Sequence, residues 1–167
     1  MRESTRLTLG SGLYAGLIGY AVVVVFIAIV NLAGGRSPFY TAALFGSALF
    51  YGLEDPATLQ VAPAPVLAYN MVHLVSFLAL GFLASWFMSV AERFPVARYA
   101  ALFTLIFVAA HVYAGLLLFA EPLLAGAWLP IGAAGVLAAV AMGWYLLRVH
   151  GALRRSLSEI PMGAEEE

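Results

Sequence analysis

The feature that most constrains this chain is a long run of uncharged, mostly apolar residues from Pro65 to Val90. An α-helix rises about 1.5 Å per residue and the hydrocarbon core of a bilayer is about 30 Å thick, so about 20 apolar residues cross it. The run exceeds that length. The composition agrees, because 63% of the residues are hydrophobic and 10% are charged, whereas about a quarter are charged in ordinary soluble domains. The sequence therefore predicts an all-α membrane protein.

Three further apolar stretches are long enough to cross a bilayer as helices. The four predicted spans are residues 11–32, 65–89, 96–119 and 128–147. A signal peptide is the alternative for the first stretch, but the apolar region of a signal peptide is usually only about 7–15 residues long. Because most connecting loops are short, consecutive spans are expected to run antiparallel. The predicted architecture is a polytopic membrane protein built as an antiparallel four-helix transmembrane bundle.

A shorter segment, residues 38–53, is rich in aromatic residues and begins with Ser37 and Pro38, a typical helix start. If this segment does not cross, one side of the bilayer carries every arginine except Arg36. That side holds Arg2, Arg6, Arg93, Arg98, Arg148, Arg154 and Arg155. Cytoplasmic loops carry the excess of arginine, so the pattern predicts an extra interfacial or re-entrant helix on the outer face. Both termini are then cytoplasmic, and the expected location is the inner (cytoplasmic) membrane.

The predicted transmembrane domain covers residues 1–155, and residues 156–167 are predicted to form a disordered cytoplasmic tail. The chain contains no cysteine, which excludes disulfides, thiolate metal sites and thiol catalysis. Its net charge of −1 gives no indication of a nucleic-acid partner. The expected surroundings are the lipid bilayer and other membrane proteins or further copies of the chain.

Two histidines lie inside predicted spans, where polar side chains are costly and need a partner or a purpose. At 1.5 Å per residue, His73 lies about 10 Å and His111 about 12 Å below the outer ends of two consecutive antiparallel spans. The two imidazoles are therefore expected at matching depth. Tyr69, Asn70 and Phe77 share the helix face of His73 by their spacing.

Three interpretations of the histidines stay open. In the first, His73 and His111 form hydrogen bonds with groups such as Asn70 and Tyr113 and fix the register of the helices. In the second, both histidines are axial ligands of a b-type heme or another histidine-ligated macrocycle, with Tyr69, Asn70 and Tyr113 beside it. Both interpretations place the residues that contact the histidines in the outer half of the bundle.

In the third interpretation, His73, His111 and Glu121 bind a metal ion, since zinc, copper and iron accept imidazole and carboxylate ligands. No zinc-protease motif, phosphate-binding loop or serine-hydrolase motif occurs in the chain. The favoured prediction is therefore a non-catalytic packing or assembly partner within the membrane. The alternative is an electron-transfer protein that holds heme or a metal through His73 and His111.

Small and polar residues at other places give further expectations. Gly12 and Gly16 have a spacing that permits close helix contact, and Gly135, Ala139 and Gly143 form a small-residue stripe on the last span. The inner half of the second span is expected to be almost purely apolar. His150, next to arginines, is expected in solvent or at the level of the lipid headgroups.

Overall fold

The computed structural model describes residues 2–94, 106 and 128–159, with side chains over residues 8–92, 94, 106 and 128–155. Within these residues every element is helical. The elements are α1 (Arg2–Ala33), α2 (Tyr40–Tyr51), the 3-10 helix η1 (Pro56–Thr58), α3 (Pro63–Arg93), α5 (Trp128–Val149) and α6 (Gly151–Glu159). The predicted span over residues 96–119 lies outside the described residues, as do His111, Tyr113 and Glu121.

Three of the described helices are long and apolar enough to cross a membrane. These segments are Thr8–Ala33, Pro63–Glu92 and Trp128–Val149. The all-helical class is thus confirmed for the described part of the chain, whereas only three of the four predicted spans are found there. α3 begins at Pro63, two residues earlier than predicted, because proline is tolerated in the first turn of a helix, where its missing N–H has no partner to lose.

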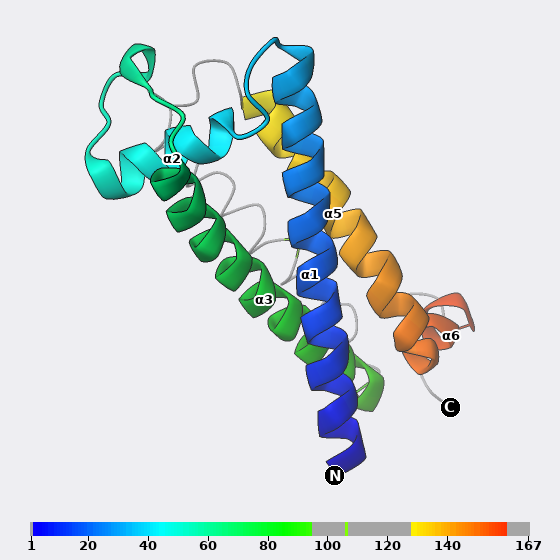
Figure 1. Cartoon of the computed structure of the whole chain (residues 1–167). Helices are drawn as coiled ribbons and strands as arrows, with labels where there is room; N and C mark the ends of the chain where they lie inside the picture. Colours follow the sequence, from blue (N-terminus) through cyan, green and yellow to red (C-terminus); the bar gives the residue numbers. More distant parts are fainter. Residues whose placement is uncertain (1, 95–105, 107–127, 160–167) are drawn as a thin grey trace.

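α1 lies between α3 and α5 and packs against both, whereas α3 and α5 hardly touch each other. Figure 1 shows that α3 and α5 both run opposite to α1. α1 and α3 lie close together toward the N-terminus and diverge toward the other end, where α2 lies across the start of α3. A cluster of buried apolar side chains sits in the half of the molecule where the helices are close, and it consists of Ala15, Ala84, Met142 and Leu146.

The close approach of α1 and α3 depends on glycine. A Cβ atom added to Gly16 would lie 2.6 Å from the carbonyl oxygen of Phe77 and 2.8 Å from Cα of Leu78. A Cβ atom added to Gly81 of α3 would lie 2.8 Å from Cα of Gly16. These neighbours are backbone atoms that cannot rotate away, so only glycine fits on either side of the crossing. The spacing of Gly12 and Gly16 indicated such a contact, but not its partner Gly81.

Hydroxyl groups bond across the same crossing. Oγ of Ser11 lies 2.6 Å from Oγ of Ser85, and Oγ1 of Thr8 lies 2.8 Å from Oγ of Ser89. The Ser85 hydroxyl also donates to the carbonyl oxygen of Thr8 at 2.9 Å. The expectation that the inner half of this span is almost purely apolar is wrong for α3, because small serines fit between helices that approach closely and are covered there.

α5 contacts α1 through a face other than the predicted stripe. Ala134, Ala138, Met142 and Leu146 are buried, four residues apart along the helix. Gly135 and Gly143 belong to a different face, and no described residue lies within 4 Å of a Cβ atom placed on either one. The helix then breaks at His150, and α6 extends to Glu159. The predicted disordered tail therefore begins too early, because residues 156–159 belong to α6; residues 160–167 lie outside the described residues.

One amide side chain fastens α2 to the end of α1. Asn31, which is 5% exposed, donates from Nδ2 to the carbonyl oxygen of Pro38 at 3.2 Å. Its Oδ1 accepts a hydrogen bond from Oγ1 of Thr41 at 3.0 Å. On the other side of α2, a Cβ atom on Gly46 would lie 2.6 Å from the carbonyl carbon of Pro65. α2 is therefore held against α1 by hydrogen bonds and against α3 by backbone contact.

Candidate functional site

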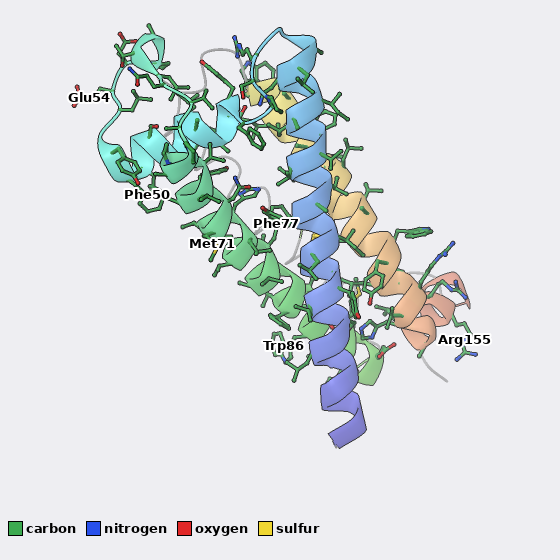
Figure 2. All side chains as sticks on the ribbon, in the orientation of Figure 1. Phe50, Glu54, Met71, Phe77, Trp86 and Arg155 are labelled. Atoms are coloured by element: carbon green, nitrogen blue, oxygen red, sulfur yellow. The ribbon has the colours of Figure 1, made fainter. Side chains whose placement is uncertain are left out.

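His73 lies in an aromatic cluster on the face of α3 that points toward α1. The Tyr69 ring stacks on the imidazole, with centroids 5.2 Å apart and an angle of 23° between the planes. Phe77 meets it edge-on at 5.0 Å, and Tyr20 of α1 lies 6.1 Å away. Phe45 of α2 stacks on the far side of Tyr69 at 5.6 Å. Figure 2 shows Phe77 on the α1 side of α3 and Met71 on the opposite side.

Asn70 connects this cluster to α1 without bonding to His73. Its Oδ1 accepts a hydrogen bond from the Tyr20 hydroxyl at 3.0 Å, and its Nδ2 donates to the carbonyl oxygen of Val66 at 2.8 Å. Asn70 therefore fixes α1 against α3. The spacing along the helix indicated that Tyr69, Asn70 and Phe77 lie near His73, but the link from Asn70 to Tyr20 could not be found from spacing alone.

The Nε2 atom of His73 is buried and has no hydrogen-bond partner in the described structure. Leaving such a group unpaired costs about 1–3 kcal/mol, so a partner or a ligand is expected at this atom. The residues predicted to share the site, His111, Tyr113 and Glu121, lie outside the described residues. Among the described residues, no group of three histidines or carboxylates is placed to hold a metal ion.

A second histidine, His150, lies at the opposite end of the molecule and is fully buried. His150 is 1% exposed, and its Nδ1 lies 3.0 Å from Oε2 of Glu92 at the end of α3. The expectation that His150 is solvated is wrong, because the chain turns between α5 and α6 and the ring packs against the end of α3. Its Nε2 is also buried without a partner in the described structure. The sequence held one indication of this contact, because Glu92 and His150 both follow the predicted inner ends of spans.

No protein-family model, no curated protein and no solved structure matches this chain. The class of protein is therefore defined by the features described above. These are an all-helical described part, three helices long and apolar enough to cross a membrane, and two histidines, His73 and His150, whose Nε2 atoms are buried.

Proposed function

We propose that this chain is a small integral membrane protein that acts as a packing or assembly partner in the inner (cytoplasmic) membrane and has no catalytic activity of its own. The observation that carries the proposal is the exposure of its apolar helices. In the most apolar window of each long helix, only 17%, 22% and 22% of the residues are buried inside the described structure. Faces of this size and composition are stable only against lipid or another protein.

A four-span topology is part of this proposal. α3 ends near the N-terminus of α1, whereas α5 begins at the opposite end of the molecule (Figure 1). The two helix ends lie on opposite sides of the assembly, and the apolar composition of residues 96–119 supports a fourth crossing between them. α2 has 12 residues, or about 18 Å of helix, which is too short to cross. An outer position for α2 and cytoplasmic termini follow from the arginine distribution.

The proposed contact surfaces are the small-residue stripe of α5 and the exposed aromatic residues at the two ends of α2. Phe39, Phe50 and Tyr51 are 56%, 47% and 62% exposed. Aromatic side chains are enriched at the centres of protein interfaces, and small residues let helices approach closely within a membrane. The partner is another membrane protein or a second copy of this chain.

Photo-crosslinking in native membranes tests the assembly role. A photoreactive residue placed at Ala139 of the stripe or at Phe50 of α2 is expected to give a discrete protein adduct of reproducible mass. The same residue at Val25 of α1, which is 58% exposed on another apolar face, is the matched control and is expected to give only lipid adducts. Adducts with lipid alone at all three positions would contradict the assembly role.

A second candidate function is supported by the unpartnered Nε2 of His73. A buried imidazole nitrogen that has no hydrogen-bond partner is suited to bind the iron of heme b or another metal ion. With such a group bound, the protein would act as an electron carrier. Tyr69, Phe77 and Tyr20 supply the aromatic surroundings of such a group. The proposed second ligand is His111, with Glu121 as a further candidate for a metal.

The visible spectrum and the metal content of the purified full chain test this alternative. A cofactor is expected to give a Soret band, or about one metal ion per chain, that disappears in His73→Ala and in His111→Ala. Ser76→Ala is the matched control, because Ser76 lies three residues from His73 but is exposed and bonded to the carbonyl oxygen of Val72. A colourless, metal-free protein would rule out the electron-transfer function and leave the assembly role.

A further inference from the structure

An apolar groove runs between α1 and α5 on the surface of the helical assembly. Its volume is ≈ 690 Å³, and every side chain that lines it is apolar or aromatic. On α1 the lining extends from Ala21 to Ile29, about 12 Å along the helix, and on α5 from Leu137 to Trp144, about 10 Å. The groove is thus elongated along the helix axes, the direction in which a lipid acyl chain lies in a bilayer.

Arg148 lies at the α6 end of this groove, and two further arginines lie on α6 at the same end of the molecule. The guanidinium carbon of Arg148 lies 3.8 Å from the centre of the Trp144 ring, which itself lines the groove. Arg154 and Arg155 are exposed on α6, which begins directly after this point, and Figure 2 shows Arg155 on the outer side of α6. The carboxylate of Glu92, at the same end of the molecule, is already bonded to His150. The described side chains around the groove end therefore carry net positive charge.

We propose that this groove binds one acyl chain of an anionic phospholipid whose phosphate headgroup is held by Arg148 and Arg154. A zwitterionic lipid offers the same acyl chains but no net negative charge, so the arginines select the anionic lipid. An arginine near an anionic membrane surface contributes about fivefold in binding. The inference rests on the membrane embedding proposed above and goes beyond it by naming a ligand class and its site.

Quenching of Trp144 fluorescence by brominated lipids tests the site. The chain has three tryptophans, so the double substitution Trp86→Phe and Trp128→Phe leaves Trp144 as the reporter beside the groove. This protein is reconstituted into vesicles with increasing fractions of brominated phosphatidylglycerol or of brominated phosphatidylcholine with the same chains. Half-maximal quenching is expected at an about 25-fold lower mole fraction of the anionic lipid, since two arginines contribute about fivefold each.

Three further variants separate a groove site from general attraction of anionic lipid to a basic surface. Arg154→Gln is expected to reduce the preference about fivefold without touching Trp144. Arg36→Gln, beyond the opposite end of α1, is the matched control and is expected to leave the preference unchanged. Ala141→Phe fills the groove and is expected to abolish the preference although all arginines remain.

The outcomes distinguish this inference from the proposed membrane embedding. Equal quenching by both lipids, or a preference that survives Ala141→Phe, would overturn the lipid site while leaving the protein in the membrane. Absence of quenching by either lipid would overturn the membrane embedding and the lipid site together. The expected pattern is strong quenching by both lipids at high fraction, with the anionic lipid effective first.

Discussion

Replacing Gly81 by alanine is expected to lower the free energy of unfolding by about 3 kcal/mol, at the upper end of the usual cost of overpacking. The added Cβ atom would lie 2.8 Å from Cα of Gly16, and neither backbone can yield unless α1 and α3 move apart. Such a movement would also break the hydrogen bond between Ser11 and Ser85. Unfolding by a denaturing detergent in mixed micelles, followed by circular dichroism, measures the effect.

Gly10→Ala is the matched control for this experiment, because Gly10 lies on α1 but no described residue lies within 4 Å of its added Cβ atom. Alanine favours a helix over glycine by about 1 kcal/mol, so Gly10→Ala is expected to be neutral or stabilising. Gly16→Ala is expected to behave like Gly81→Ala. If Gly81→Ala and Gly10→Ala changed stability in the same direction, the close crossing of α1 and α3 would be wrong.

Replacing Glu92 by alanine is expected to cost about 2 kcal/mol, because it leaves the buried His150 ring without its bonded carboxylate. Unlike the glycine substitutions, this change creates no clash. Because Glu92 lies on α3 and His150 lies at the α5–α6 junction, the loss is expected to loosen that junction first. Faster hydrogen exchange of the α6 amides, together with a lower unfolding midpoint, measures the effect.

Two further variants test whether the hydrogen bond between Glu92 and His150 causes this loss of stability. Glu92→Gln retains an oxygen and an amide that can bond to either tautomer of His150, so it is expected to lose less than Glu92→Ala. His150→Leu removes the hydrogen bond and also the unpartnered Nε2, and it leaves a carboxylate that is 25% exposed and can reach water. It is therefore expected to cost less than Glu92→Ala. Equal stability of Glu92→Ala and Glu92→Gln would contradict the proposed role of the hydrogen bond.

The lengths of the apolar runs correctly predicted the three long apolar helices of the described residues, because the length needed to cross a bilayer depends only on the helical rise. The length of an apolar run does not determine the rotation of the helix about its axis. The helix contacts that were not predicted depend on that rotation. In α5 the buried face contains Ala138 and Met142 and lies beside the small-residue stripe, and its position was not predicted. Ser85 was missed for the same reason, since its burial follows from its position opposite Ser11.

The candidate site was predictable only within one helix. The spacing of Tyr69, His73 and Phe77 indicated one face, and these rings do contact each other in α3. The contact of His150 with Glu92 depends on a turn after α5 that no periodic pattern announces. Local periodicity therefore gave the neighbours of His73, whereas contacts between residues far apart in the sequence needed the structure.

The uneven spacing of α1 and α3 has a mechanical consequence. The two helices are in backbone contact at Gly16 and Gly81 and are linked again by the hydrogen bond between Tyr20 and Asn70. They diverge toward the end of α1 (Figure 1), so the part of α1 after Tyr20 can act as a lever. From Tyr20 to Ala33 this part of α1 measures about 20 Å, and a tilt of about 5° would shift its end by about 2 Å. Asn31 couples that end to α2, so a tilt of α1 would strain the backbone contact between α2 and the start of α3.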